Sequence, residues 1–139
     1  MEERIEKKIF PLNLKGSWYK TLGKEQLLHI SVCDYLDYKY PHIFYFHPHN
    51  EAKRTPYERF LIKVMRLRPG VPDLLVPISK QGKTGMALEF KIKPNKLTDN
   101  QIRIIKIFNS YNWKVNICYN FDQAKIYIDK YLKEDENEG

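Results

Sequence analysis

Two carboxylates and a lysine stand within residues 70–101, at the ends of two short apolar segments. Asp73 follows a Gly-Val-Pro turn sequence, and Glu89 is separated from Lys91 by a single residue. Carboxylate oxygens are the ligands that Mg²⁺ prefers in proteins, and a neighbouring ammonium group can orient water or stabilise charge on a phosphate. The three residues therefore indicate a divalent-metal site suited to cleaving a phosphodiester.

Placing Asp73 and Glu89 side by side requires a compensating cation. The two segments have the length of a β-hairpin, although the register of the pairing cannot be read from the sequence. Two carboxylates about 4 Å apart repel each other by about 4 kcal/mol at an effective dielectric constant of about 20. Lys91 supplies one positive charge, and a bound Mg²⁺ or Mn²⁺ would supply two more. The Glu-x-Lys pattern alone is equally consistent with a surface salt bridge between Glu89 and Lys91.

A helix is expected over residues 22–38, with Thr21 as its cap. At helical spacing Glu25 shares a face with Leu28 and Val32, and that face is otherwise apolar. A carboxylate there is costly to desolvate unless it is paired or bound to metal. Glu25 is therefore a candidate third ligand. It also lies one turn from the helix start, where the helix dipole favours an acid, so both explanations stay open.

The remaining elements predict an α/β fold with a central mixed sheet. Thr98 and Gln101 have the form of a capping box, so Gln101 serves the helix start alone or the site as well. The elements expected are strands at 43–47, 73–78, 86–92 and 113–119, helices at 55–67, 97–111 and 120–132 capped by Thr55, Thr98 and Asn120, and a turn at 79–85 with Gly82 and Gly85 as hinges.

The chain is basic, with 24 Lys and Arg against 17 Asp and Glu, for a net charge of +7. Such a charge attracts a polyanion, and nucleic acid is the first candidate, ahead of an anionic membrane surface or mere solubility. The densest run of cations surrounds the helix expected at 55–67, where few acids accompany them. The residues expected to contact phosphate are Lys53, Arg54, Arg59, Lys63, Arg66 and Arg68.

Several other classes of protein are disfavoured. The two cysteines are far apart and form no CxxC, which argues against a zinc ribbon or a disulfide framework. His47 and His49 have no acid or cysteine at the usual zinc-ligand spacing. No apolar run approaches the ~20 residues needed to span a bilayer, and no apolar segment follows the charged N-terminus. The sequence predicts a cytoplasmic protein without membrane contact or organic cofactor.

The combination of these motifs resembles the VRR-NUC family of the PD-(D/E)xK nuclease superfamily. The resemblance runs from Glu25 to Leu132 and is carried by separated matches. They are Gly70-Val71-Pro72-Asp73, Glu89-Phe90-Lys91, Leu97-Thr98-x-x-Gln101, an acid on the first helix at Glu25, and Asn50 with Arg54 ahead of the Gly-x-Pro-Asp turn. The departures are Phe90, where a leucine is usual, and a short link before Gly70.

The resemblance implies a restriction-endonuclease-like core with about four strands and a metal-dependent DNA endonuclease. The short members of the family resemble Holliday-junction resolvases and act as dimers, in phage or at the host nucleoid. By the resemblance, Asp73 and Glu89 bind Mg²⁺ or Mn²⁺, with the Phe90 carbonyl as a further ligand. Glu25 is a ligand directly or through water, Lys91 activates the attacking water, and Gln101 positions the site, while Asn50 joins the DNA contacts.

On this interpretation residues 1–16 form an N-terminal arm, residues 17–133 a single nuclease domain, and residues 134–139 an acidic, disordered tail. The alternative is a nucleic-acid-binding module that keeps the nuclease fold but does not cut. The two differ in whether divalent metal produces cleavage of any branched or linear DNA.

Overall fold

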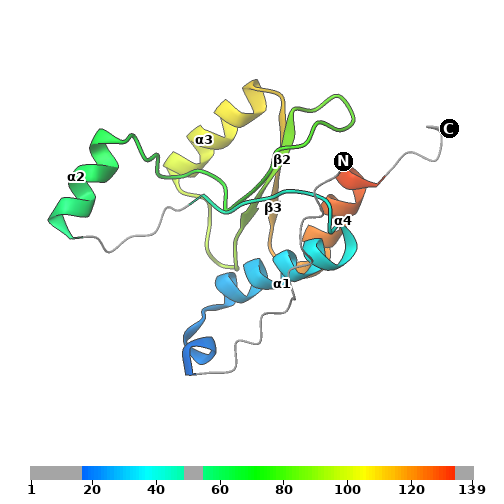
Figure 1. Cartoon of the computed structure of the whole chain (residues 1–139), viewed down its shortest axis with the longest axis horizontal. Helices are drawn as coiled ribbons and strands as arrows, with labels where there is room; N and C mark the ends of the chain where they lie inside the picture. The colour runs from blue at the N-terminus through cyan, green and yellow to red at the C-terminus, as the bar shows by residue number, and fades with distance from the viewer. Residues whose placement is uncertain (1–16, 49–54, 134–139) are drawn as a thin grey trace, which may run out of the picture.

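The computed structural model describes residues 17–48 and 55–133, shown in Figure 1. The expected arm at 1–16, the expected tail at 134–139, and Asn50, Lys53 and Arg54 lie outside the described residues. The elements in chain order are η1 Ser17–Thr21, α1 Lys24–Lys39, α2 Pro56–Val64, β1 Leu74–Val76, β2 Gly85–Phe90, α3 Asp99–Ser110, β3 Trp113–Cys118 and α4 Phe121–Leu132. In the described part of the chain, no helix combines the length and apolarity needed to cross a membrane.

The strands form a mixed sheet, which confirms the predicted α/β class. Its order is β1-β2-β3, with β1 and β2 antiparallel and β2 and β3 parallel. The strand expected at 43–47 is reduced to a single bridge, in which the backbone groups of Phe46 and Leu75 bond to each other at 3.0 and 2.9 Å. Pro48 follows at once and has no N–H to continue the pairing. Among the described residues the sheet therefore has three strands rather than about four.

The two faces of β2 have different surroundings. Met86, Leu88 and Phe90 are fully buried and join a hydrophobic cluster contributed mainly by the sheet, α1 and α4. Glu89 lies on the opposite face, where its carboxylate meets a side chain of α3. Figure 1 shows α1 and α4 together on one side of the sheet and α3 on the other. The predicted alternation, with Glu89 opposite Leu88 and Phe90, is thus the alternation between core and α3.

The start of α1 differs from the prediction. Its N-cap is Gly23, not Thr21, because the Thr21 hydroxyl donates to the Trp18 carbonyl at 2.6 Å within η1. The Gly23 N–H instead donates to the Gln26 side-chain oxygen at 2.9 Å. The threonine hydroxyl therefore bonds to a backbone carbonyl of its own turn and not to the start of α1, as short polar side chains often do.

The other predicted helix starts are confirmed. Each cap side chain accepts a hydrogen bond from the backbone N–H three residues later, which satisfies one of the donors that a helix start leaves unpaired. The pairs are Thr55 with Glu58 at 3.2 Å, Thr98 with Gln101 at 3.1 Å, and Asn120 with Gln123 at 2.9 Å. The second helix ends earlier than predicted, at Val64, and Arg66 two residues later has a positive φ of 59°.

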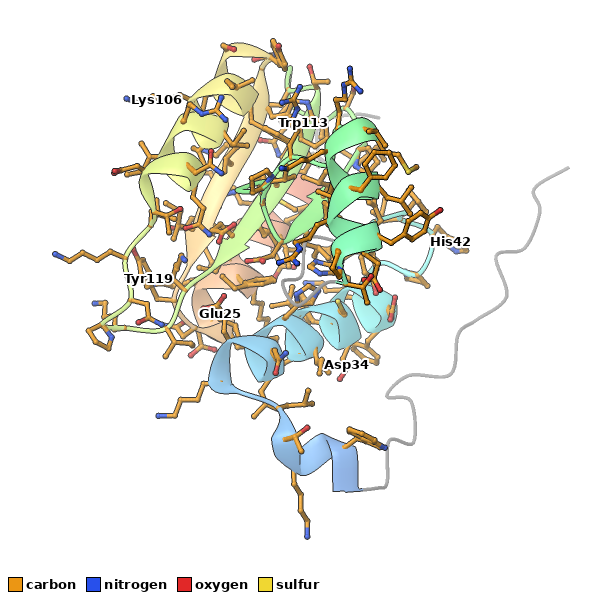
Figure 2. All side chains as sticks on the ribbon, turned by 90° about the vertical axis from the view of Figure 1, so that its left-hand side faces the viewer. Glu25, Asp34, His42, Lys106, Trp113 and Tyr119 are labelled. Carbon is orange, nitrogen blue, oxygen red and sulfur yellow. The ribbon has the colours of Figure 1, made fainter. Side chains whose placement is uncertain are left out.

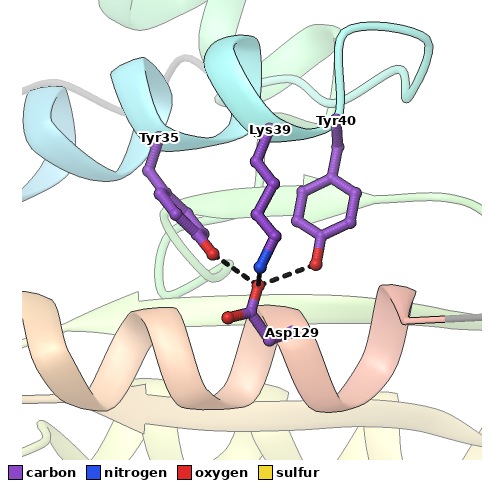
Figure 3. Close-up of polar contacts among 4 residues, drawn as sticks. All are labelled: Tyr35, Lys39, Tyr40 and Asp129. Carbon is purple, nitrogen blue, oxygen red and sulfur yellow. Dashed lines mark hydrogen bonds and ion pairs between the residues drawn. The ribbon is translucent and has the colours of Figure 1, made fainter.

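A polar cluster fastens α1 to α4. One oxygen of Asp129, Oδ1, accepts hydrogen bonds from the hydroxyls of Tyr35 at 2.5 Å and Tyr40 at 2.7 Å, and from the Lys39 ammonium at 3.1 Å, as Figure 3 shows. Burial alone would raise the pKa of Asp129, but the donated hydrogen bonds outweigh it and lower the pKa. These contacts fix the angle at which α1 crosses α4, and hence the position of Glu25 at the other end of α1.

The two glycines predicted as hinges of the β1–β2 turn serve different purposes. Gly82 has a φ of +76°, which a residue with a side chain rarely adopts. Gly85 has no such φ. A Cβ at Gly85 would lie 2.5–2.8 Å from atoms of the Trp113 ring, so this glycine allows β3 to pack against β2. The prediction that Gly85 is a hinge was therefore wrong.

Candidate active site

The turn that delivers Asp73 is held by backbone geometry. Gly70 has a φ of +87°, and a Cβ there would lie 3.0–3.1 Å from atoms of Asn100. The Asn100 side chain donates to the Pro69 carbonyl at 2.8 Å, which ties the turn to the first turn of α3. Pro72 is buried and restricts the approach to the strand. Asp73 therefore enters β1 from a fixed direction.

The hairpin register places the two carboxylates opposite each other. Leu74 pairs with Leu88, so the next position outward sets Asp73 against Glu89. Asp73 Oδ2 accepts a hydrogen bond from the Phe90 backbone N–H at 2.7 Å, and the two carboxyls are also hydrogen-bonded to each other. The structure thus brings together the pair whose register the sequence left undetermined.

Glu89 is almost completely buried, with 2% of its surface exposed, and its pKa is raised to about 8. Burial is the largest cause, followed by the charge of Asp73, and Glu25 adds to the increase. Burial also raises the pKa of Asp73, against the opposing effect of the Phe90 N–H. Without a cation, then, Glu89 holds a proton at neutral pH, because the site cannot accommodate two adjacent negative charges.

Lys91 lies within this site rather than at the surface. Its exposed fraction is 8%, and its charge lowers the pKa of both Asp73 and Glu89. The alternative of a surface salt bridge between Glu89 and Lys91 is therefore excluded, because neither residue is at the surface. A single ammonium group does not offset the effect of burial on Glu89, since the pKa of that carboxyl remains high.

Gln101 serves the helix start and the site at the same time. Its Oε1 accepts a hydrogen bond from the Thr98 backbone N–H at 2.9 Å, which completes the predicted capping box. Its Nε2 donates to Glu89 Oε1 at 2.9 Å. Gln101 thus caps α3 and also contacts Glu89, and the second contact links α3 to the buried carboxylate.

A pocket of about 260 Å³ opens beside the carboxylates and is lined by Glu25, His29, His47, Asp73 and Phe90, among others. Glu25 is half-buried and acts on Glu89 electrostatically, so the predicted third acid does lie near the pair. Figure 2 labels Glu25 at the start of α1, below the sheet. The half-burial also explains why the apolar face of α1 tolerates an acid at this position.

Two histidines of the pocket were not predicted as site residues. His47 Nδ1 donates to the Asp73 carbonyl at 2.5 Å, because a carbonyl can only accept. The His29 ring meets the His47 ring edge-on, with 4.7 Å between centroids, and burial together with His47 lowers the pKa of His29 to about 4. The only sequence signal for His29 is its position one helical turn after Glu25.

The residues present fit a hard divalent cation. Asp73 and Glu89 each have one oxygen held by a protein donor, and the repulsion between the two carboxyls is relieved if a cation replaces the shared proton. Mg²⁺ is typically held by one or two carboxylates together with water and phosphate oxygens. Within residues 17–48 and 55–133, no group of three or more His, Cys, Asp or Glu side chains is arranged to hold a metal by itself. Asp73 and Glu89 match the one or two carboxylates that a protein usually contributes to a Mg²⁺ site.

The predicted phosphate contacts that the structure describes lie on or just after α2. Arg59, Lys63, Arg66 and Arg68 are all exposed. The Arg66 guanidinium donates to the Val64 carbonyl at 2.5 Å, at the end of the helix. Figure 1 shows α2 projecting from one side of the molecule, connected to β1 by a loop.

Comparison with known proteins identifies the family. The sequence model of the VRR-NUC domain matches residues 17–122. The chain belongs to the VRR-NUC family. Membership in the VRR-NUC family implies a nuclease of PD-(D/E)xK type, and nucleases of this family typically use a divalent metal.

The fold agrees with the family. The structure is similar to a solved structure described as a "VRR_NUC domain protein", with a TM-score of 0.61 and 18% sequence identity over 81% of this chain and 90% of the other. At this identity the likeness concerns the fold alone. No curated protein matches the chain. The assignment of Asp73, Glu89 and Lys91 within this VRR-NUC domain therefore rests on the geometry of the site.

Proposed function

We propose that this VRR-NUC protein is a DNA endonuclease that hydrolyses phosphodiester bonds with Mg²⁺ or Mn²⁺. Asp73 and Glu89 would hold the cation, the Phe90 carbonyl would be a further ligand, and Glu25 would contribute an oxygen directly or through water. One observation carries the proposal: a buried carboxyl pair in which the pKa of Glu89 is raised to about 8, next to the buried Lys91. A pair of acids is costly to bury beside each other unless a cation joins them.

Each residue has a distinct part in the proposed reaction. When bound, the cation polarises the scissile phosphate and lowers the pKa of an attacking water. Lys91 orients that water and stabilises charge that develops on the phosphate. Gln101 holds Glu89 through Nε2, and the Phe90 N–H holds Asp73, so that neither carboxylate has to reorganise during the reaction.

Selectivity and assembly are the finer parts of the proposal. The exposed cations Arg59, Lys63, Arg66 and Arg68 would hold the phosphate backbone of the substrate. From the family resemblance we propose a preference for branched, junction-like DNA and a homodimer, because two symmetric cuts require two sites related by a two-fold axis. The basic helix leading to the Gly70 turn supports DNA as the substrate.

The decisive test is cleavage of a panel of branched, flapped, nicked and linear DNAs at a stated salt concentration, with Mg²⁺, with Mn²⁺ and with neither. We expect cutting only with metal, and faster cutting of branched substrates. Lys91→Ala should abolish cutting and leave DNA binding measurable. The exposed Lys114 on the neighbouring strand offers a matched control, Lys114→Ala, which should cut at the normal rate. If the protein binds these DNAs but cuts none with either metal, it is a binding module and the proposal is wrong.

A further inference from the structure

Helix α2 carries large aromatic side chains that nothing in the described molecule covers. All nine of its residues are described, and none is buried. Tyr57 is 68% exposed and Phe60 57% exposed, and Val64 is exposed as well. Large apolar side chains gathered on one exposed element commonly mark a binding surface.

The arrangement around the helix mixes these aromatics with cations. At 3.6 residues per turn, Arg59, Lys63, Phe60, Val64 and Tyr57 follow one another around one side of α2. All five are exposed, and together they are called the outer face of α2 here. The remaining side carries Glu58, Leu61 and Ile62, each only half-exposed. The outer face is thus basic along one edge and aromatic along the other.

This composition favours nucleic acid over another protein as the partner. The cores of protein–protein interfaces are depleted in lysine, whereas the outer face of α2 sets Lys63 beside Phe60. Surfaces that bind single-stranded nucleic acid combine cations for the backbone with aromatic side chains on which bases stack. In duplex DNA the bases are already stacked, so the aromatic edge would find a partner only where bases are unpaired.

The position of α2 in the chain points to the same substrate as the carboxylate site. The helix is followed by Arg66 and Arg68, and then by the Gly70 turn that delivers Asp73. The turn is anchored to α3 through Asn100 and Pro69, so the carboxylate end of the link is fixed. Only residues 65–72 of the chain separate α2 from Asp73, so a DNA strand bound by α2 is linked to the cutting site by a short segment.

We propose that the outer face of α2 binds unpaired nucleotides next to a branch point in DNA, with Tyr57 and Phe60 stacking on bases and Arg59 and Lys63 contacting the adjoining phosphates. The inference rests on the proposed function, because it assigns the preference for branched DNA to this surface. It makes the two aromatics specificity-determining residues that take no part in the chemistry.

Binding in EDTA tests the proposal without cleavage. The probes are a synthetic flap DNA with 2-aminopurine at the first unpaired position, and a fully paired duplex of the same length. We expect the intact protein to quench the 2-aminopurine fluorescence on binding. Tyr57→Ala with Phe60→Ala should weaken flap binding about tenfold or more, remove the quenching, and leave duplex binding unchanged, because stacking contributes roughly 1–3 kcal/mol per base. Arg59→Gln with Lys63→Gln should weaken both DNAs and reduce the salt slope by about 2.

Matched controls separate this surface from general effects. Tyr111, at the end of α3, is also 68% exposed, and Tyr111→Ala should change neither DNA. Thermal unfolding should be nearly unaffected by Tyr57→Ala with Phe60→Ala, since α2 buries no side chain. Equal weakening of flap and duplex by the aromatic variant would overturn the proposal.

A second outcome would also overturn the proposal. In that case Tyr57→Ala with Phe60→Ala would convert a dimer to a monomer in light scattering and would still prefer flap DNA to duplex DNA. The outer face would then be an interface between copies of the chain. Failure of the proposed nuclease function looks different: flap binding and quenching would persist, and neither Mg²⁺ nor Mn²⁺ would produce cutting.

Discussion

Asp129 and Glu89 are both carboxylates that face another element across the fold, yet their surroundings differ. Asp129 Oδ1 accepts three hydrogen bonds, from Tyr35, Tyr40 and Lys39. The pKa of Asp129 is lowered although burial works in the opposite direction. Three protein donors therefore stabilise the charged form of Asp129 in the contact between α1 and α4.

Glu89 has fewer hydrogen-bond donors than Asp129. Its Oε1 accepts a hydrogen bond from the Gln101 side chain, and the carboxyl lies beside a second acid, Asp73. Its pKa is raised to about 8, with burial as the first cause. Glu89 is also far more buried than Asp129, with 2% of Glu89 exposed against 26% of the Asp129 side chain, so burial and the lack of donors act together on its pKa. What distinguishes Glu89 is a shortage of positive charge that Lys91 does not make up, and a divalent cation would remove that shortage.

The largest expected effect comes from neutralising the carboxylate that lacks donors. Glu89→Gln, and likewise Asp73→Asn, should lower the rate of metal-dependent DNA cleavage at least about a thousandfold, because the cation loses a ligand and the phosphate its stabilising charge. Single-turnover cleavage at saturating enzyme measures this rate, and a filter-binding assay should show that DNA still binds. Cutting by Glu89→Gln at the parent rate would show that the metal lies elsewhere.

A smaller effect is expected from Gln101→Glu. Glutamate can still accept from the Thr98 N–H and complete the capping box, but it cannot donate to Glu89 and adds a further negative charge. Cleavage should fall about tenfold to a hundredfold, the usual range for a residue that orients a metal ligand.

The matched control is Gln123→Glu, at the start of α4, where the Gln123 side chain also accepts from a backbone N–H. That variant should cut normally. If both variants lost activity equally, the defect of Gln101→Glu would reflect the helix cap and not Glu89.

The stability of the metal-free protein should depend on pH through Glu89. Its carboxyl has a pKa of about 8 when folded, against a value of 4.5 for an unperturbed glutamate. Between these values the folded state binds more protons than the unfolded state, so the contribution to stability is full below pH 4.5, declines as the pH rises, and is gone by about pH 8.

Urea unfolding in EDTA at pH 5 and pH 8 measures this loss. Glu89→Gln should show a smaller fall in the free energy of unfolding between the two pH values, because glutamine does not ionise. Asp129→Asn offers the opposite case and should retain the fall, since the group responsible is still present. A parent protein whose stability rose steadily from pH 5 to pH 8 would contradict the assignment.

The smallest effect on chemistry, and a clear one on stability, is expected from Asp129→Asn. Replacing the charged acceptor weakens three hydrogen bonds between α1 and α4, which should lower the free energy of unfolding by about 1–3 kcal/mol. The cleavage rate per folded molecule should stay within about twofold. Thermal unfolding and single-turnover cleavage at a temperature well below the transition test the two statements together.

The sequence predicted the features that depend on neighbours in the chain. The caps at Thr55, Thr98 and Asn120 were correct because each is settled within four residues. Thr21 failed as a cap although the choice was also local, since its hydroxyl donates to the backbone carbonyl of Trp18 and does not accept from a helix N–H.

Features that depend on distant pairing were not predictable. The expected strand at 43–47 has suitable residues, but its pairing is decided by β1 and Pro48 and leaves one bridge. The identities of Asp73, Glu89 and Lys91 as a group followed from residue types and from the family resemblance, whereas their register did not. His47 reached the site because the neighbouring Phe46 pairs with Leu75 of β1, and no periodicity in the sequence indicates that pairing.

The hairpin register has a consequence for how the chain folds. Asp73 and Glu89 are brought face to face by β1 and β2, the most local pairing in the sheet, whereas β3 joins β2 only after the crossover through α3. Local pairings generally form early, because the loops they close are short. The chain therefore meets the repulsion between its two acids before Gln101 arrives to hold Glu89. Refolding of the metal-free chain should slow as the pH rises toward 8, and a divalent cation present from the start should restore its speed.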